Sequence, residues 1–428
     1  MLNVLRTTWP LLLGVLLLMV GNGMQGTLLG IRGQIEGIGT YQMSLVMSAY
    51  FAGFLFGSRM VPGMIRRVGH VRVFAALGSL ISAVLIGYAA FPHWMAWVAM
   101  RVLIGFSFSG VYITAESWLN AGSTNENRGQ ALSAYMIVQM IGIIAGQALM
   151  TAGDPGGYFL FVIPSILVSL AFTPILLSVT PAPAFGEIKR MSFARLFRAS
   201  PLGIVGMFLM GGIFSALFGM ASVWGTQAGL SVGQVSAFIA AIYVGGLVLQ
   251  YPIGWASDRM DRRVLILALA VIGAAVMVLA ATTPLPFALL LVSAALVGGV
   301  ANPLYALLIA YTNDFLDNSN MASASAGLMF VNGLGAISGP VVTGWLMEQF
   351  GTDGFFVYLA GLFVLLAGYA GWRMTRRAAI AVEDTGAFAV ISPTASVVAV
   401  ETSLQAAQDG ADSANNEGRD DSDTARPV

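Results

Sequence analysis

Apolar residues along the chain gather into twelve long runs that short polar segments separate. A helix needs about 20 mostly apolar residues to span a bilayer. Because backbone groups that lack hydrogen bonds are costly in lipid, each spanning run must be helical. We therefore predict transmembrane helices over residues 9–30, 42–64, 71–91, 95–118, 130–152, 158–179, 202–224, 234–256, 264–283, 286–311, 322–347 and 353–373. The first run has no cleavage-site pattern, so we interpret it as a retained helix and not a signal peptide.

The composition supports a membrane protein and argues against several classes of function. Hydrophobic residues make up 57% of the chain and charged residues 9%, whereas soluble domains carry roughly 25% charged residues. The net charge of zero gives no reason to expect a nucleic-acid partner. The chain has no Cys and only two His residues, and it has no Gly-rich phosphate loop, so we expect no metal, no cofactor and no ATP hydrolysis.

The positions of Arg and Lys predict the orientation in the membrane. Basic residues cluster in alternate loops, and the intervening loops hold only Arg32. Because basic loops stay in the cytoplasm, this alternation places both termini in the cytoplasm of a multi-pass protein of the bacterial inner membrane. The clusters are Arg66, Arg67 and Arg72; Arg128; Lys189, Arg190, Arg195 and Arg198; Arg259, Arg262 and Arg263; and Arg373, Arg376 and Arg377.

The chain divides into two membrane halves and two polar segments. We predict an N-terminal six-helix bundle over 1–179, a cytoplasmic linker over 180–200 and a C-terminal six-helix bundle over 201–377. The linker is basic and ends in an amphipathic stretch from Met191 to Phe197. Residues 378–428 turn polar and acidic, which is typical of disorder, so we predict a disordered cytoplasmic tail.

An internal repeat relates the two halves. A shift of 192–193 residues aligns Gly105 with Gly298 and Tyr112 with Tyr305, and it continues to align residues from the second to the fifth helix of each half. An even number of helices per half gives both halves the same topology. Parallel repeats of this kind occur in transporters, whose binding site lies in mid-membrane between the halves. The fold that we predict is an all-α membrane protein of two parallel-related six-helix bundles.

Two motifs carry a resemblance to a known family. The segment Gly254-Trp-Ala-Ser-Asp-Arg-Met-Asp-Arg-Arg263 resembles the signature loop of the major facilitator superfamily, and Arg101-Val-Leu-Ile-Gly-Phe-Ser-Phe-Ser-Gly110 resembles its fourth-helix segment. Residues 21–30, 47–54, 116–120 and 128–130 look like the YcaD-like subgroup of bacterial transporters. The resemblance covers about residues 9–375 and implies a secondary transporter without naming its substrate.

The resemblance also implies that the first, fourth, seventh and tenth helices line a central cavity. Arg101 is the central candidate, because a charge inside lipid is costly and is seldom idle. A structural Arg held by helix amides and backbone carbonyls is the alternative. The candidate cavity residues are Asn22, Gln25, Arg101, Phe108 and Tyr112 from the first half and Phe214, Phe218, Asn302 and Tyr305 from the second.

A second set of charged residues predicts a cytoplasmic gate. Glu116 lies in the last turns of the fourth helix, and we expect it to pair with Arg72 or Arg128. The resemblance implies that such a pair holds the cytoplasmic side shut in the outward-facing state; the alternative is a static ion pair that only assists folding. The signature loop adds Asp258, Arg259, Arg262 and Arg263 to the candidate gate.

These observations predict a transporter rather than an enzyme. Arg101 and Glu116 are the charged groups at membrane depth, and they lie about 22 Å apart along one helix, too far to act together. We expect alternating access for a small solute, either drug-like or a small organic compound, with proton coupling as an option and with the bilayer and the solute as partners. We expect the protein to work as a monomer. A facilitated-diffusion permease and a non-transporting sensor or scaffold are the alternatives.

Overall fold

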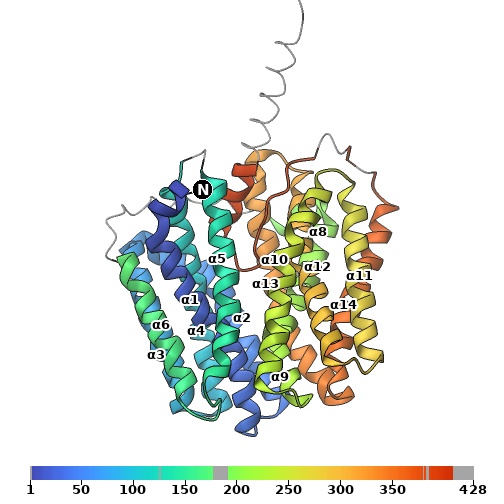
Figure 1. Cartoon of the computed structure of the whole chain (residues 1–428). Coiled ribbons are helices and arrows are strands. Elements are labelled where there is room, and N and C mark those ends of the chain that lie inside the picture. The colour runs from blue at the N-terminus through green and yellow to red at the C-terminus, as the bar shows by residue number, and fades with distance from the viewer. Residues whose placement is uncertain (1, 125–126, 177–190, 379, 382–384, 408–428) are drawn as a thin grey trace, which may run out of the picture.

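The structure is a computed structural model that describes residues 2–124, 127–176, 191–378, 380–381 and 385–407. Throughout these residues the regular structure is helical (Figure 1). Eleven of the described helices are long and apolar enough to cross a membrane, and a shorter apolar helix stands in the sixth position of the predicted order. The all-α prediction is confirmed.

The described residues of the N-terminal half form six helices and one short turn. Loop glycines with positive φ join some of them, as at Gly69 between α2 and α3, where φ is 88° and a residue with a Cβ would be strained. The elements are α1 (Leu2–Ile35), α2 (Thr40–Val68), α3 (His70–Ala90), α4 (Trp94–Ala121), α5 (Arg128–Leu149), the 3₁₀ turn η1 (Met150–Ala152) and α6 (Phe159–Leu176).

The C-terminal half begins with a short helix on the surface, α7 (Phe193–Ala199), where the amphipathic end of the linker was predicted. The rest of the predicted linker, up to residue 190, lies outside the described residues. The remaining elements are α8 (Pro201–Ser215), the π turn η2 (Ala216–Met220), α9 (Ala221–Gln227), α10 (Val232–Ser257), α11 (Arg262–Thr282), α12 (Phe287–Asn313), α13 (Asn318–Phe350) and α14 (Asp353–Met374). Together α8, η2 and α9 make one membrane span.

Glycines hold equivalent helix pairs in close contact in the two halves. A Cβ on Gly105 of α4 would lie 1.9 Å from the carbonyl oxygen of Tyr50 in α2. Its repeat partner Gly298 of α12 would place a Cβ 2.0 Å from the carbonyl oxygen of Ile242 in α10. Small residues permit backbones to approach this closely in membranes, where packing drives helix association. The predicted parallel repeat is therefore visible in the packing of both halves.

The two ends of the bundle differ in how the halves meet. The end that carries Arg66, Arg128 and Arg262, together with the start of α1, is called here the arginine-rich face and lies at the top of Figure 1. At the opposite face the halves touch directly: the Ser222 hydroxyl donates to the carbonyl of Gly26 at 3.4 Å, and Glu348 accepts from the backbone N–H of Tyr41 at 3.1 Å.

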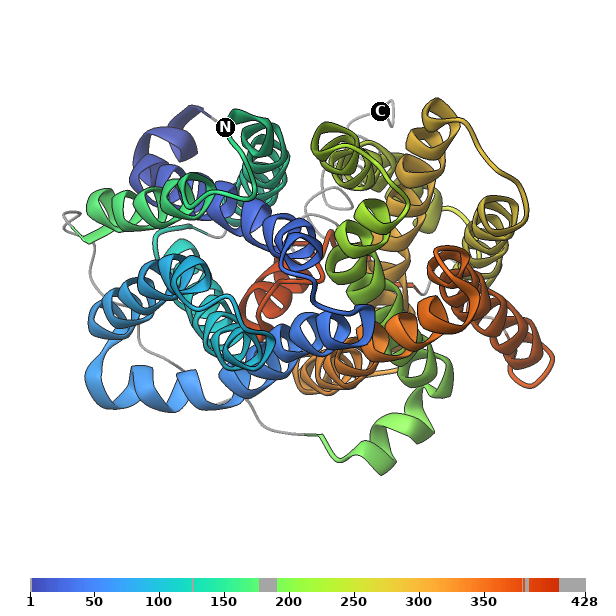
Figure 2. The same cartoon turned by 90° about the horizontal axis from the view of Figure 1, so that it is seen from below.

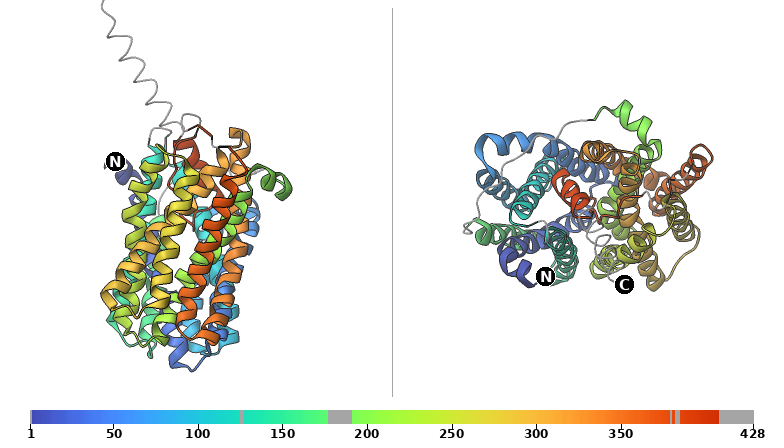
Figure 3. Two further views of the ribbon diagram at one scale, coloured as in Figure 1. Left: turned by 90° about the vertical axis from the view of Figure 1, so that its right-hand side faces the viewer. Right: turned by 90° about the horizontal axis from the view of Figure 1, so that it is seen from above.

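Residues 385–407 correct the prediction of a wholly disordered tail. They run along the arginine-rich face and end in a helix over Val397–Ala407, which lies between the two halves when the bundle is seen from either end (Figures 2 and 3). Val400 is fully buried and Ile391 is 3% exposed. The composition of the whole tail concealed this apolar segment, whose residues find a hydrophobic surface at the face of the bundle. Residues 408–428 lie outside the described residues.

Candidate functional site

A central cavity of about 600 Å³ lies between the halves. It is lined by α1, α2, α4 and α5 on one side, by α8, η2, α10, α12 and α13 on the other, and by residues 392–398 toward the arginine-rich face. Eight of the nine predicted cavity residues line it: Asn22, Gln25, Arg101, Tyr112, Phe214, Phe218, Asn302 and Tyr305. Phe108 does not line it: the side chain is fully buried, and its ring centroid lies 6.2 Å from that of Tyr112.

A chain of side-chain hydrogen bonds forms the polar wall of the N-terminal half. Arg101 Nη1 donates to Gln25 Oε1 at 2.7 Å, and Gln25 Nε2 donates to Asn22 Oδ1 at 3.1 Å. Asn22 Nδ2 in turn donates to the hydroxyl of Tyr112 at 3.2 Å. Gln25 and Asn22 lie three residues apart on α1 and so face α4 together. The chain fixes the direction of each amide and holds the guanidinium at the cavity.

Arg101 is a buried cation without an acidic partner among the described residues. It is 3% exposed, its guanidinium lies 4.8 Å from the centre of the Tyr50 ring, and Nη2 lies 3.5 Å from the sulfur of Met47. Its Nε has no hydrogen-bond partner. Neutral amides and a ring compensate only part of the cost of burying a charge. The site is therefore electrostatically suited to a negative or strongly accepting group.

The C-terminal half supplies an aromatic wall. The rings of Phe214 and Phe218 stack with centroids 5.8 Å apart, and Tyr243 stacks on Phe218 at 4.8 Å. Tyr305 meets Phe214 edge to face at 5.7 Å. The π turn η2 contains Phe218, and such turns in spanning helices often occur at functional sites. The result is a continuous apolar surface on which a flat ring can stack.

Asn302 contributes less to the cavity than its polarity suggested. Its Nδ2 donates to the carbonyl of Gly298 in the preceding turn of α12 at 3.2 Å, which satisfies part of its hydrogen-bonding capacity within its own helix. The side chain packs against Gly246 of α10, where a Cβ would lie 2.2 Å from the amide nitrogen. Asn302 is thus held in one place beside Tyr305 and is available to a solute through its second N–H and its carbonyl oxygen Oδ1.

The predicted ion pairs of Glu116 are absent from the described residues. The Glu116 carboxylate instead accepts from the hydroxyl of Tyr135 at 3.1 Å and from the backbone N–H of Ser396 at 2.8 Å. Arg72 is exposed, and Arg128 donates to Gln405 at 3.2 Å. The prediction was wrong because residues 385–407 reach Glu116, and a backbone N–H satisfies the carboxylate in place of an arginine.

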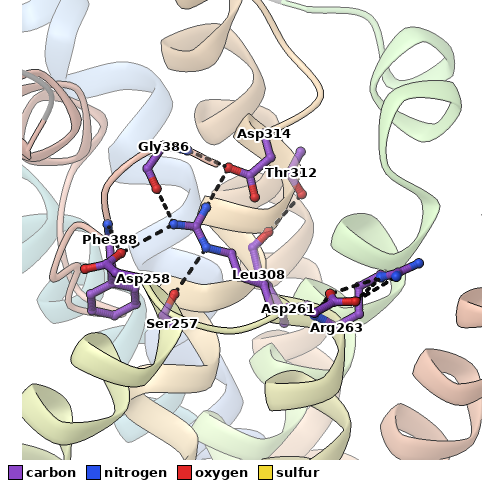
Figure 4. Close-up of polar contacts among 10 residues, drawn as sticks. Ser257, Asp258, Asp261, Arg263, Leu308, Thr312, Asp314, Gly386 and Phe388 are labelled. Carbon is purple, nitrogen blue, oxygen red and sulfur yellow. Dashed lines mark hydrogen bonds and ion pairs between the residues drawn. The ribbon is translucent and has the colours of Figure 1, made fainter. Parts of the chain in front are cut away.

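The signature loop binds residues 385–407 as well. Arg262 pairs with Asp314 at 2.6 Å and with Asp258 at 3.7 Å, and it donates to Ser257 Oγ at 3.1 Å. Figure 4 shows Gly386 and Phe388 beside this cluster. Burial raises the pKa of Asp314, and the nearby guanidinium of Arg262 offsets part of that rise.

The other predicted gate residues of the loop contact side chains of the loop and of the end of α10, and Arg263 Nη1 also donates to the carbonyl of Arg377 at 2.6 Å. Arg263 pairs with Asp261 at 2.7 Å, and Arg259 lies over the ring of Trp255 at 4.3 Å. Burial works to raise the pKa of Asp261, but the stronger combined effect of Arg263 lowers it below its usual range. The described residues contain no group of three or more His, Asp or Glu side chains that would suit a metal ion.

Several cavity residues escaped the sequence analysis. Tyr50, Gln139, Gln147, Tyr243 and Asn332 all line the cavity. They lie on α2, α5, α10 and α13, helices that the search for a site did not include. Gln139 and Asn332 could have been found from the sequence, because the internal repeat aligns these two amide side chains with each other.

Comparison with known proteins agrees with the fold. The sequence profile of the Major Facilitator Superfamily matches residues 11–243 and 226–402, so this chain belongs to that superfamily of membrane transporters. The chain is also similar to transporters named YcaD, the subgroup that its motifs resemble. An uncharacterized transporter of Enterobacter sp. (strain 638) is 26% identical over 83% of this chain and 93% of its own length. The uncharacterized transporter YcaD of Salmonella arizonae is 25% identical over 82% of this chain and 92% of its own length.

Solved structures share the fold at low sequence identity. The nucleoside transporter NupG covers 86% of this chain and 98% of its own, with a TM-score of 0.70 and 16% identity. A bacterial homologue of the human lysosomal transporter Spinster, in an inward-facing and unoccupied conformation, covers 92% of this chain and 96% of its own, with a TM-score of 0.66 and 14% identity. These likenesses establish the architecture.

Proposed function

We propose that the protein moves a small organic anion with a flat ring across the bacterial inner membrane by alternating access. One observation carries this proposal: Arg101, a buried cation without an acidic partner among the described residues, lines a cavity of about 600 Å³ together with the aromatic wall of the other half. That volume is typical of pockets for small molecules, which lie within roughly 300–1,000 Å³. A carboxylate on the solute would neutralise Arg101, and its ring would stack on Phe218 and Tyr243.

The proposed state of the molecule is inward-facing. The positive-inside rule assigns the arginine-rich face to the cytoplasm, and with it both termini. Contacts between the halves, such as those of Ser222 with Gly26 and of Tyr41 with Glu348, close the opposite, periplasmic face. The cavity lining reaches toward the cytoplasm as far as Arg59, Arg66 and Met191. A solute at Arg101 would therefore face the cytoplasmic side in this state, where residues 392–398 also line the cavity.

Binding to both halves explains how a solute would promote the change of state. Arg101 belongs to the N-terminal half, whereas Phe218 and Tyr243 belong to the C-terminal half. A solute that touches both sets favours the conformations in which the halves approach each other around it, because a ligand shifts an equilibrium only through its differential affinity for the two states. Rocking about the solute would open the periplasmic face as the cytoplasmic face closes.

The experiment compares a ring acid with a neutral analogue in proteoliposomes. We expect uptake of 4-hydroxybenzoate to exceed that of 4-hydroxybenzamide, because only the acid neutralises Arg101. A hydrogen bond to a charged group contributes about 2 kcal/mol, so Arg101→Ala should weaken apparent affinity roughly thirtyfold. Leu103→Ala is the matched control, since Leu103 lies on the same helix but is 41% exposed on the outer surface. Equal transport by a well-folded Arg101→Ala protein would eliminate the site.

A facilitated-diffusion permease is the second candidate, and the nature of Arg101 favours it. An arginine keeps its proton at physiological pH, so it cannot carry a coupling proton. Glu116, the buried carboxylate four residues after Tyr112 on α4, is the group that we assign to proton coupling if it occurs. Accumulation of the acid above its outside concentration under a pH gradient would support a coupled transporter, and equilibration alone would support the permease.

A further inference from the structure

We propose that residues 385–398 form a strap that occupies the cytoplasmic mouth of the cavity, and that the strap must leave before solute can pass or the face can close. The strap is thus the ligand of a peptide-binding site built from both halves. The proposal rests on the proposed function for its effect on transport, although the occupancy of the mouth can be tested without any solute.

The strap is attached to the N-terminal half through Glu116. The backbone N–H of Ser396 donates to Glu116 Oε2 at 2.8 Å, while Tyr135 holds the other carboxylate oxygen at 3.1 Å. Glu116 is 1% exposed, so this hydrogen bond to a charged acceptor is shielded from water. Thr394 Oγ1 adds a longer contact of 3.5 Å to Gln139 Oε1 of α5.

The strap is attached to the C-terminal half through the signature loop. The backbone N–H of Phe388 donates to Asp258 Oδ1 at 2.9 Å, and that of Gly386 donates to Asp314 Oδ1 at 3.1 Å. Arg262 donates to the carbonyl of Gly386, so the strap joins the ion pair of Arg262 with Asp314 (Figure 4). The ring of Phe388 packs against Gly254 of α10. A Cβ on Gly254 would lie 2.8 Å from this ring, so the absence of a side chain at Gly254 makes room for it.

Between these two attachments the strap covers the cavity. Residues 392–398 line it directly. Ala389, Ile391 and Ala395 are each at most 6% exposed, which removes apolar surface from water and favours the docked position. The helix Val397–Ala407 then continues along the start of α5, where a Cβ on Gly129 would touch Ala406 at 3.5 Å.

The strap is attached to both halves, and this placement determines how it would affect the change between conformations. Glu116 and Gln139 belong to one half, and Asp258 and Asp314 belong to the other or to its loops. Closing the cytoplasmic face requires α4 and α5 to approach the ends of α10 and α12, and the strap lies in that space. A docked strap therefore holds the inward-facing state and blocks the exit, whereas release removes both restraints.

The attachments contact the main chain of the strap more than its side chains. Glu116, Asp258, Asp314 and Arg262 all bind N–H or C=O groups of the main chain. Specificity for this segment must then come from the buried apolar side chains between the attachments. Residues 385–398 carry no charged side chain, so the three carboxylates bind them through main-chain N–H groups.

Accessibility of a single cysteine in the cavity tests the strap. The chain has no Cys, so Ser58→Cys, a conservative change at the cavity wall on α2, gives one reactive thiol. A membrane-impermeant maleimide would be applied to the detergent-solubilised full chain, to a chain that ends after residue 381 and to a control that ends after residue 407. Ser133→Cys, on the exposed side of α5, corrects for general reactivity.

We expect the chain that ends after residue 381 to label about tenfold faster than the full chain, because a strap docked roughly nine-tenths of the time leaves only the open fraction reactive. The chain that ends after residue 407 should label as slowly as the full chain. Equal rates for the full chain and the chain that ends after residue 381 would overturn the proposal. Fast labelling of the chain that ends after residue 407 would overturn the assignment to residues 385–398.

A disulfide test keeps the proposal falsifiable if the shorter chain fails to fold. In the full chain, Thr394→Cys with Gln139→Cys should form a disulfide on mild oxidation, and Thr394→Cys with Ser133→Cys should not. Failure of the first pair to cross-link, or equal cross-linking of both pairs, would contradict the docked strap. Neither assay uses a solute, so these results are independent of whether 4-hydroxybenzoate is transported.

Discussion

The glycine contacts that repeat in the two halves predict how replacement of Gly by Ala changes stability. The change should be destabilising where two helices touch at the glycine, and neutral or stabilising where the glycine faces open space. Replacing Gly105 by Ala puts a Cβ 1.9 Å from the Tyr50 carbonyl oxygen, where ordinary contact begins at 3.4 Å. The shortfall of 1.5 Å (3.4 less 1.9) falls on backbone atoms, so α2 and α4 must separate. Gly298→Ala likewise puts a Cβ 2.0 Å from the carbonyl oxygen of Ile242, so α10 and α12 must also separate.

Overpacking of a well-packed interface costs about 1–3 kcal/mol. For a domain of 150–250 residues each kcal/mol lowers the melting temperature by roughly 2–4 °C, so a central cost of about 2 kcal/mol corresponds to a loss of about 4–8 °C. Both variants should show this loss when the fraction of monodisperse protein in detergent is measured after heating.

The controls are Gly361→Ala and Gly368→Ala in α14, where nothing lies within 4 Å of the added Cβ. In a helix interior Ala is favoured over Gly by up to about 1 kcal/mol, so these two changes should be neutral or stabilising. The reasoning would be refuted if Gly105→Ala and Gly298→Ala melted at the temperature of the controls.

Two further predictions concern the membrane and the buried carboxylate. Reporter fusions after residues 92 and 154 should report the periplasm and those after residues 68 and 317 the cytoplasm; a reproducible inversion at any of them would contradict the assigned orientation. Glu116→Gln keeps a hydrogen-bond acceptor but cannot release a proton, so any uptake that a pH gradient drives should fall to the level without a gradient while equilibrating uptake persists. Uptake that still responds to the gradient would show that another group carries the proton.

The sequence predicted the helices and the position of most cavity residues because both depend on local rules. The length of an apolar run determines a span, and a spacing of three or four residues places Arg101 and Tyr112 on one face of α4. Asn22 and Gln25 were predicted as cavity residues from their estimated depth in the membrane along α1.

The parts that the sequence did not predict depend on contacts between distant segments. Tyr50 and Tyr243 point into the cavity because of how α2 and α10 pack, which no local spacing reveals. The partner of Glu116 was missed for the same reason, since Ser396 follows it by 280 residues. Composition averaged over residues 378–428 concealed the apolar segment around Ile391 and Val400, whose burial depends on the surface that the two halves present together.

Distances across the two faces, measured with spin labels, test the central claim of alternating access most directly. One pair would join Arg67 to Asp317 at the arginine-rich face, and the other would join Ile35 to Gly229 at the opposite face. With 4-hydroxybenzoate present and the chain ended after residue 381, we expect a shorter distance to appear for the first pair and a longer one for the second. A transported solute that leaves both distance distributions unchanged would contradict the account.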